Sequence, residues 1–170
     1  MKEFIVNLEV EKFFLPLSRD AEVLAVVILP NKKILLHRKK FYPPNVYRLL
    51  SGGIKKNENV EKALVRELKE ETNVKTWNKK LLGKIIFNIK SPKGKKFFTT
   101  YIFLVKTKSS NIKPLDSKEQ ISKLKEIKIS ELPSVIRKLQ SLRTKNWREW
   151  GKFRAIAHQI VYEMLKKNSC

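Results

Sequence analysis

The order of the predicted elements places this chain in the α/β class, with a mixed β-sheet and helices on its faces. Three observations predict this fold. Short apolar runs of strand length come first, a segment with helical periodicity follows at residues 59–73, and more strands precede two amphipathic segments near the C-terminus. With 170 residues, the chain is expected to form a single domain, residues 1–170, with its own hydrophobic core.

The first half of the chain contains four segments with strand character, at residues 1–17, 22–29, 33–38 and 46–50. The first of these is expected to be a strand or an arm packed on the body. Pro30 and Asn31 predict a turn between the second and third, so these two strands are expected to pair as a hairpin. Pro43 and Pro44 cannot donate to a strand ladder, and we therefore expect a loop before the fourth segment.

The second half is predicted to hold strands at residues 81–89, 96–106 and 122–129, and helices at 59–73, 130–142 and 146–168. Asn59 is a favourable N-cap for the first of these helices. Asn73 tolerates the left-handed conformation in which many helices end. These two asparagines therefore set the expected limits of that helix.

The charge of the chain is strongly unbalanced, with 38 Lys and Arg residues against 16 Asp and Glu residues, a formal net charge of +22. This predicts an anionic partner, such as nucleic acid, a phosphorylated metabolite or an anionic membrane face. Most of the cations are lysines spread along the chain, whereas specific phosphate recognition favours arginine. Nucleic acid is therefore possible as a partner but not favoured over a solvated, lysine-rich surface.

The apolar segments are too short to suggest a membrane protein. The longest run, residues 23–29, has the length of a buried strand, and no leader peptide is recognised at the N-terminus. We therefore expect no membrane association and a cytoplasmic location. The single cysteine, Cys170, cannot form an internal disulfide, and its terminal position argues against a catalytic role.

The acidic residues are concentrated in one short segment. Five of the 16 lie between positions 58 and 71, namely Glu58, Glu61, Glu67, Glu70 and Glu71. Successive helical residues are about 100° apart, so Glu67, Glu70 and Glu71 fit within an arc of roughly 100° and can converge on one point. Their mutual repulsion is unfavourable without a counter-ion. Oxygen ligands on a rigid helix suit Mg²⁺ or Mn²⁺ rather than zinc.

A plainer interpretation of the same segment is a solvated helix with one ion pair, between Arg66 and Glu70. Charged helices are common, and glutamates alone would favour this interpretation. The spacing of the residues decides against it.

That spacing resembles the Nudix box, the 23-residue signature of Nudix hydrolases, at residues 52–74. Eight of its nine defining positions match: Gly52, Glu58, Arg66, Glu67, Leu68, Glu70, Glu71 and Val74. The departure is Asn73, where the family has glycine; asparagine is the best substitute in a left-handed position. Many members also carry an acidic residue and a glycine where this chain has Lys55 and Asn57.

The resemblance implies an α/β/α sandwich with a mixed sheet and a catalytic helix after a glycine-rich loop. It also implies hydrolysis of a nucleoside diphosphate linked to another moiety, with Mg²⁺ or Mn²⁺. The metal ligands would be Glu67, Glu70, Glu71 and the carbonyl of Ser51. Arg66 would orient the carboxylates, including Glu58, and one glutamate of the set would hold or deprotonate the attacking water. A downstream base is the alternative, with Glu119 as its candidate.

The substrate stays open at this point. A small phosphorylated nucleotide, such as a nucleoside triphosphate, a nucleotide sugar or ADP-ribose, is the leading expectation. The charge favours a second candidate, the 5′ end of RNA. A third is a catalytically silent module with the same fold that binds nucleotide or nucleic acid.

Several residues outside the box are candidates for substrate contact. Arg38, Lys39 and Arg48 flank the loop before the box and are expected to clamp phosphate, unless they belong to a solvated loop. The aromatic residues of that loop either stack on a base or pack the loop itself; they are Phe41, Tyr42 and Tyr47.

Three further predictions concern residues without a box position. His37 and His158 have no partner at metal-ligand spacing and are interpreted as structural. The aromatic residues Trp147, Trp150 and Phe153 fall at helical spacing. They are expected to pack the last helix on the sheet or to form a homodimer interface, with a substrate wall as the alternative.

Overall fold

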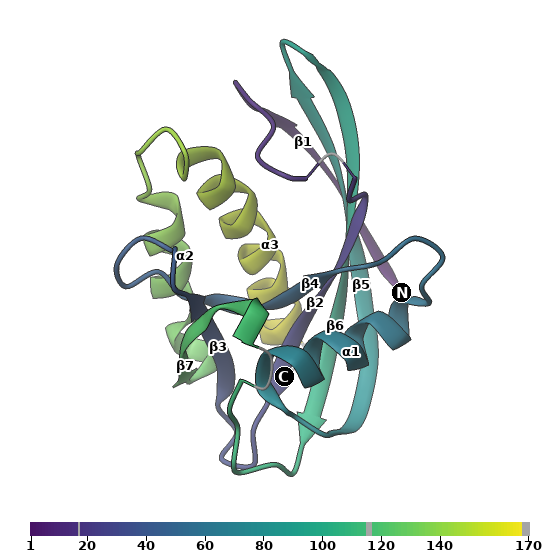
Figure 1. Ribbon diagram of the computed structural model, residues 1–170, viewed down its shortest axis with the longest axis vertical. Coiled ribbons are helices and arrows are strands. Elements are labelled where there is room, and N and C mark those ends of the chain that lie inside the picture. Colours follow the sequence, from purple (N-terminus) through teal and green to yellow (C-terminus); the bar gives the residue numbers. More distant parts are fainter. Residues whose placement is uncertain (17, 115–116, 168–170) are drawn as a thin grey trace.

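The computed structural model describes residues 1–16, 18–114 and 117–167, with the side chains of residues 77 and 119 excepted. In this part of the chain, strands form one mixed sheet in the order β1-β5-β6-β2-β4-β3-β7 (Figure 1). The strands are β1 (Lys2–Glu9), β2 (Ala21–Ile28), β3 (Ile34–Lys39), β4 (Arg48–Gly53), β5 (Thr76–Ser91), β6 (Gly94–Thr107) and β7 (Ile121–Ile127). The β1–β5 and β2–β6 pairs are parallel, and the other neighbours are antiparallel.

Helices lie on both faces of the sheet, as Figure 1 shows. They are α1 (Val60–Thr72), α2 (Leu132–Gln140) and α3 (Arg148–Lys167), with 3-10 turns η1 (Ser117–Glu119) and η2 (Ile129–Glu131). The mixed sheet with flanking helices that the element order predicts is therefore observed. None of the described helices is long and apolar enough to cross a membrane.

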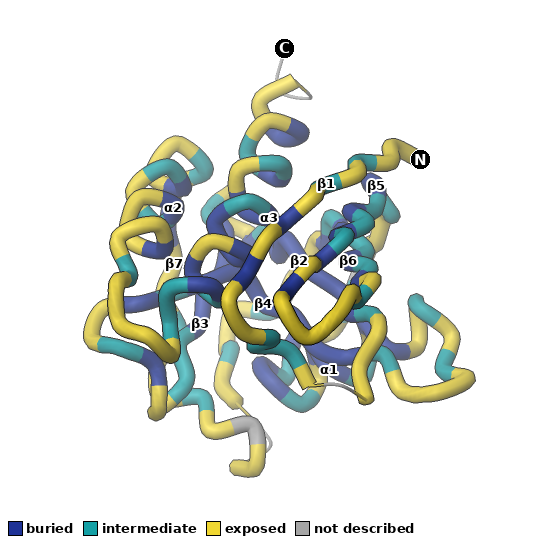
Figure 2. Tube along the Cα trace, turned by 90° about the horizontal axis from the view of Figure 1, so that it is seen from above, coloured by how far each residue is buried: buried dark blue, intermediate teal, exposed yellow. Residues whose placement is uncertain are grey.

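Strand β2 divides the interior into two cores because its side chains alternate between the faces of the sheet. Leu24 and Val26 belong to the core beneath α2 and α3. Val23, Ala25 and Val27 belong to the core beneath α1. Figure 2 shows the result: buried residues run along the central strands, and exposed residues follow the loops. This arrangement places α1 on one face of the sheet, beside β4, the strand that carries the glycine pair.

The predicted hairpin of the second and third strands is confirmed only beside its turn. Strand β4 lies between β2 and β3, which pair only at Ile28 and Ile34 beside the turn. Beyond that turn the two strands separate, and β4 hydrogen-bonds to both of them. A turn signal in the sequence predicts only that the strand residues next to the turn pair with each other. Further from the turn, β4, which comes later in the sequence, takes the place of the expected partner strand.

Helix α1 is capped at both ends by the predicted asparagines. The side chain of Asn59 accepts hydrogen bonds from the backbone N–H groups of Glu61 (2.9 Å) and Lys62 (3.2 Å). Asn73 is left-handed, with φ of 55°, and its N–H donates to the carbonyl of Lys69. Asn57 is also left-handed, with φ of 62°. Asparagine therefore takes the left-handed conformation at both positions where the family commonly has glycine.

The aromatic residues at the start of α3 pack the helix onto the molecule. The ring of Phe153 lies 4.5 Å from that of Phe87 on β5. Trp150 and Trp147 lie 5.1 and 5.8 Å from the ring of Tyr42 in the loop before β4. Intramolecular packing, one of the two expectations for this helix, is therefore observed, and Tyr42 packs its own loop.

Candidate active site

Arg66 connects the glutamates of the acidic segment through a set of hydrogen bonds, here called the Arg66 hub. Its guanidinium donates to Glu58 through Nε (2.7 Å) and Nη2 (2.8 Å), and to Glu67 (2.6 Å) and Glu70 (3.2 Å) through Nη1. Nη2 also donates to the carbonyl of Gly53, over 2.8 Å. The ion pair with Glu58 that the resemblance implies is thus present, together with the Arg66–Glu70 pair of the plainer interpretation. One side chain ties α1 to the loop before it and to the end of β4.

The electrostatic consequence of this hub is clearest at Glu58. Hydrogen bonds from Arg66 lower the pKa of the Glu58 carboxyl from its ordinary value of 4.5 to about 2. The same contacts raise the pKa of Arg66. Both groups are therefore charged at neutral pH, and Arg66 remains in place to orient the other carboxylates.

The position of the Glu67 carboxylate requires a glycine at residue 52. A Cβ atom built on Gly52 would overlap the carboxyl group of Glu67. The carboxylate therefore lies directly against the backbone of β4, one residue after Ser51. Glycine at this position allows a helix carboxylate to approach a strand backbone more closely than any other residue would.

Glu71 is the most deeply buried of the three glutamates, with an exposed fraction of 0% against 8% for Glu67, whereas Glu70 is half-buried. Its side chain is fully buried, and Oε1 is 3.8 Å from Nδ1 of His37 on β3. Burial and the nearby cation of Arg48 lower the pKa of His37 well below its ordinary value, so the imidazole is neutral. No sequence spacing pointed to the His37–Glu71 contact, because β3 and α1 meet only in the folded chain.

Helical spacing predicted that Glu67, Glu70 and Glu71 converge. Glu67 and Glu70 both contact Nη1 of Arg66, and the convergence of all three on one metal ion stays a prediction. Among the described residues, no group of three His, Cys, Asp or Glu side chains is placed to hold a metal ion. The physical reason is that Arg66 attracts two of the carboxylates, while Glu71 faces the interior. The donor types still suit a hard divalent cation, because carboxylate oxygens lie on one helix and against a glycine backbone.

Ser51 belongs to a buried polar network. Its hydroxyl accepts from Nη1 of Arg48 (2.6 Å) and donates to Oε2 of Glu22 on β2 (3.2 Å). The other oxygen of Glu22 accepts from Thr100 (3.0 Å) and from Arg154 on α3 (2.7 Å). All five side chains are buried. The last helix therefore supports the strand that leads into the glycine pair.

His158 connects the same helix to β4. Its Nε2 accepts from the backbone N–H of Leu49 (2.9 Å), and its Nδ1 lies 2.6 Å from the carbonyl of Arg154. Burial lowers the pKa of His158 to about 3, so it is neutral. These contacts bear out a structural role for His158.

The basic residues expected to clamp phosphate make internal contacts. Arg48 is buried, and its Nε donates to the hydroxyl of Tyr42 (2.7 Å). Arg38 donates to the carbonyls of Tyr42 (3.1 Å) and Pro43 (3.5 Å), and Lys39 is half-buried. All three thus border the loop before β4, and their contact with substrate stays a prediction. The side chain of Glu119 lies outside the described residues.

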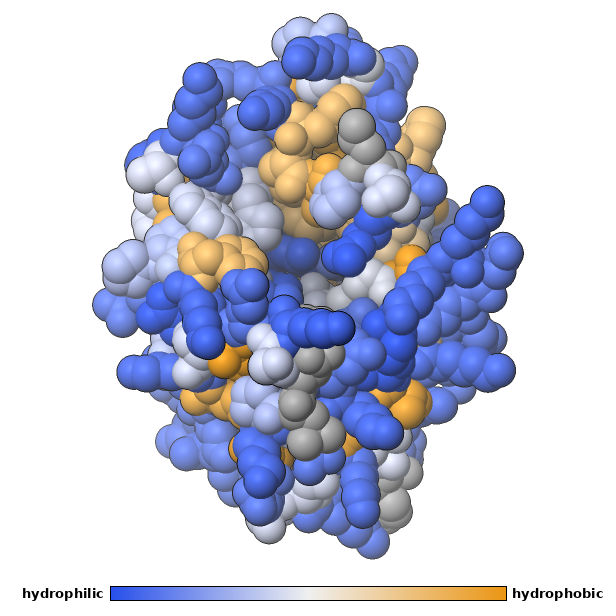
Figure 3. Space-filling model, in the orientation of Figure 1, coloured by the Kyte–Doolittle hydropathy of each residue, from blue (hydrophilic) through white to orange (hydrophobic). Residues whose placement is uncertain are grey.

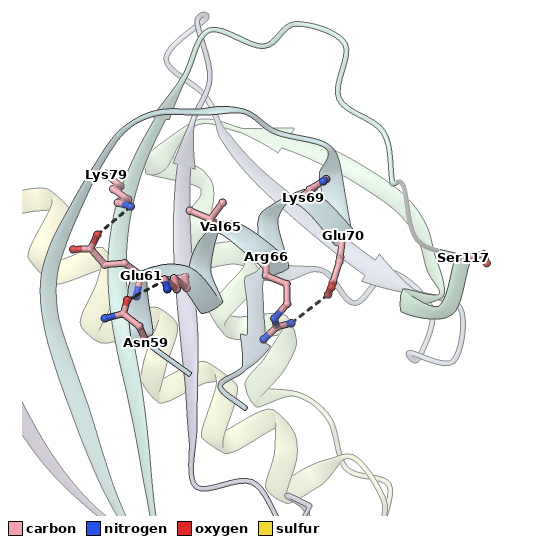
Figure 4. A pocket seen from close by; sticks show the side chains of 9 residues that line it. Asn59, Glu61, Val65, Arg66, Lys69, Glu70, Lys79 and Ser117 are labelled. Atoms are coloured by element: carbon pink, nitrogen blue, oxygen red, sulfur yellow. Dashed lines mark hydrogen bonds and ion pairs between the residues drawn. The ribbon is translucent and has the colours of Figure 1, made fainter. Parts of the chain in front are cut away.

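Two pockets open beside α1. The larger, about 900 Å³, follows the outer side of the helix from Asn59 to Glu70, where Val65 and Lys69 are exposed (Figure 4). The smaller, about 430 Å³, contains Glu67 and Glu70 together with residues of the loops on either side. The smaller pocket is the one that both of these box carboxylates line.

Sequence reasoning missed three of these residues, although two had a signal. Glu22 is the only charged residue in the apolar run of β2, and a buried carboxylate requires a partner. Arg154 lies four residues before His158, on the buried stripe of α3. Arg19 precedes β2 and lines the smaller pocket, and nothing in the sequence around it marks it.

Comparison with known proteins places this geometry in a family. The model of the NUDIX domain matches residues 18–150. An ADP-ribose pyrophosphatase of Methanocaldococcus jannaschii is 32% identical over 93 residues, 55% of each chain. The human NAD-capped RNA hydrolase NUDT12 is 42% identical over 57 residues, which are 33% of this chain and 12% of that protein. The chain thus spans about half the length of the first relative and much less of the second.

Solved structures agree on the fold. The NUDIX domain of Shewanella oneidensis NrtR, solved with ADP ribose, has a TM-score of 0.61 at 16% identity, covering 89% of both chains. A MutT NUDIX hydrolase from Burkholderia pseudomallei has a TM-score of 0.59 at 20% identity, covering 85% of this chain and 96% of that one. The α/β/α sandwich is thereby confirmed. The chain belongs to the Nudix hydrolase family.

Proposed function

We propose that this protein is a divalent-metal-dependent pyrophosphohydrolase that cleaves a nucleoside diphosphate linked to another moiety. The observation that carries the proposal is the Arg66 hub. It holds Glu58, Glu67 and Glu70 through one guanidinium and fastens them to the carbonyl of Gly53. A solvated helix needs no such cross-link between its carboxylates and a neighbouring strand.

The reaction breaks one P–O bond of the diphosphate by attack of water on phosphorus. Mg²⁺ or Mn²⁺, held by Glu67, Glu70, Glu71 and the Ser51 carbonyl, would neutralise the diphosphate and acidify the water. Glu67 or Glu70 accepts the proton of the attacking water, since both line the open pocket. Arg66 keeps the two carboxylates oriented, and the leaving phosphate departs with the electrons of the broken bond.

Within this class we favour a small substrate of the ADP-ribose type. The support is the name of the Methanocaldococcus relative, an ADP-ribose pyrophosphatase, and the ADP ribose bound to the Shewanella domain. A pocket of about 430 Å³ lies in the usual size range for small-molecule sites. Nucleoside triphosphates and nucleotide sugars belong in the same panel of test substrates.

The test is phosphate or nucleotide release from that panel with Mg²⁺, comparing the wild type with Glu67→Gln and Glu71→Gln. Each substitution keeps the shape of the side chain and removes its charge. We expect the turnover of both variants to fall by at least about 100-fold. The matched control is Glu61→Gln on the same helix, because Glu61 is exposed and pairs only with Lys79, at 3.0 Å, among the described residues.

Two results would contradict the proposal. If Glu67→Gln and Glu71→Gln both kept full turnover, the carboxylates of Glu67 and Glu71 would not take part in catalysis. Binding of panel members by a wild type that hydrolyses neither them nor capped RNA would favour the silent nucleotide-binding module. A control variant as inactive as the other two would show that the loss reflects the helix rather than the site.

A second candidate substrate is the 5′ end of RNA. It is favoured by the net charge of +22 and by the names of two sets of relatives, which are NAD-capped RNA hydrolases. The face of the molecule seen in Figure 3 is largely hydrophilic, with small apolar patches. This candidate predicts RNA binding that weakens steeply as salt is raised, and preferential hydrolysis of capped RNA over free dinucleotide.

A further inference from the structure

The loop before β2 brings an additional guanidinium to the pocket that contains Glu67 and Glu70. The pocket opens where this loop, the end of β4 and α1 meet. Four basic residues line this pocket. Arg66 is already hydrogen-bonded to glutamates, and the other three are Arg19, Lys55 and Lys56. The rim of the pocket is therefore basic, whereas its helix side is acidic.

Arg19 is placed by the second glycine of the pair. A Cβ atom built on Gly53 would overlap Nε and Cζ of Arg19, just as one on Gly52 would overlap Glu67. Successive residues of a strand face opposite sides, so the carboxylate and the guanidinium approach the same short stretch of backbone from different directions. Each glycine of the pair thus makes room for one charged side chain.

The backbone around Arg19 is fixed in position. Its own N–H donates to the carbonyl of Pro16 (3.1 Å). The carbonyl of Asp20 accepts from Thr99 on β6 (2.9 Å), and Ile54 donates to the carbonyl of Ala21 (3.1 Å). The guanidinium therefore extends from an anchored segment, which lowers the entropic cost of using it for binding.

The guanidinium of Arg19 has its hydrogen-bond donors available. Within the described part of the chain, Arg19 makes no side-chain hydrogen bond and no ion pair, although carboxylates line the same pocket. Arg66 differs, since its donors are used by three glutamates and a carbonyl. An arginine in a pocket, with a planar fork of free donors, is suited to bidentate contact with phosphate oxygens.

We propose that Arg19, assisted by Lys55, binds a phosphoryl group of the substrate that is not the one attacked. This inference rests on the proposed function and assigns a recognition residue to it. Arg19 holds the diphosphate at the rim, while Glu67 and Glu70 act on the other side of the pocket. The ligand class is thereby a pyrophosphate or longer phosphate chain.

The experiment measures binding of inorganic pyrophosphate by calorimetry, with and without magnesium chloride, and then the kinetics of the best panel substrate. We expect Arg19→Ala to weaken pyrophosphate binding about tenfold, or about 1.4 kcal/mol. KM for the substrate should rise by a similar factor while kcat changes little. Arg19→Lys should lose part of the affinity because it keeps the charge without the fork. Arg143→Ala, at an exposed position after α2, is the control and should bind as the wild type does.

A second variant tests the placement of Arg19 without changing charge. Gly53→Ala introduces a Cβ where the guanidinium now lies, so it should displace the flexible end of Arg19 and weaken pyrophosphate binding. In the Arg19→Ala background the same substitution should have little further effect on affinity. Additive losses in the double variant would show that Gly53 acts on binding independently of Arg19.

Pyrophosphate affinity of Arg19→Ala within twofold of the wild type would overturn the inference and leave the proposed function standing. So would an equal loss in Arg143→Ala, which would show a general effect of net charge. Binding that requires Arg19, in a protein that hydrolyses no panel member, would support the phosphate site and refute the proposed hydrolase activity.

Discussion

Arg154 on the last helix donates to Glu22 on β2 over 2.7 Å, and both side chains are buried. Glu22 also accepts from Ser51, the residue before the glycine pair. A helix that begins more than 70 residues after the end of the box therefore fixes the strand from which the box begins. The C-terminal helix is in this sense part of the support of the candidate active site.

The Glu22–Arg154 pair yields a stability prediction. Arg154→Met removes one partner and leaves the carboxylate of Glu22 buried beside fewer donors, which should destabilise the fold by about 3–5 kcal/mol. Chemical denaturation measures this loss. The double variant Glu22→Gln/Arg154→Met removes both charges, and we expect it to be more stable than Arg154→Met alone. A double variant whose losses simply add would show that the two residues are not energetically coupled.

Arg66 yields a prediction for catalysis. Arg66→Lys keeps a positive charge but cannot hold Glu58, Glu67 and the carbonyl of Gly53 at once. We expect kcat to fall by about 100-fold, with a smaller change in KM, because the carboxylates lose their orientation. Steady-state kinetics with Mg²⁺ measures both constants. Arg137→Lys on the exposed side of α2 is the matched control, and unchanged kcat in Arg66→Lys would argue against a hub.

Sequence patterns predicted correctly those features of the fold that depend on residues close together in the sequence, such as the ends of a helix. Helix α1 is capped by Asn59 and Asn73, as predicted, because capping depends on residues a few positions apart. The insertion of β4 between β2 and β3 was not predicted. Strand order depends on contacts between distant segments, which no turn signal contains.

The same division holds for the candidate site. The box spacing predicted that Arg66 and its glutamates act together, since they lie on one helix and the loop before it. It did not predict that Glu71 faces His37, because that contact joins α1 to β3. The pairing of Glu22 with Arg154 was missed for the same reason. Each residue could be noticed as a charge in a buried segment, but no sequence spacing shows which distant residue is its partner.

The left-handed conformation of Asn73, at the end of α1, predicts that two substitutions there will differ in their effect on the free energy of unfolding. Asn73 has φ of 55°, a conformation that costs most L-residues roughly 1–2 kcal/mol. Asn73→Ala should therefore destabilise the protein by about 1 kcal/mol, whereas Asn73→Gly should be neutral or slightly stabilising. Thermal or urea unfolding measures both. Equal destabilisation by both variants would mean that the asparagine side chain, rather than its backbone conformation, matters at this position.

The depressed pKa of Glu58 predicts how stability depends on pH. Its folded pKa is about 2 and its ordinary value is 4.5, so between these values the unfolded chain binds the extra proton and stability rises with pH. The contribution of the Glu58–Arg66 pair is therefore fully present above about pH 4.5 and is lost as pH falls through about 2. Unfolding of the wild type and of Glu58→Gln should differ by about 1 kcal/mol at neutral pH, and the difference should shrink below pH 4.5. The exposed Glu61→Gln serves as the control. A difference that persists undiminished at pH 2 would mean that Glu58 stabilises the loop by packing rather than by charge.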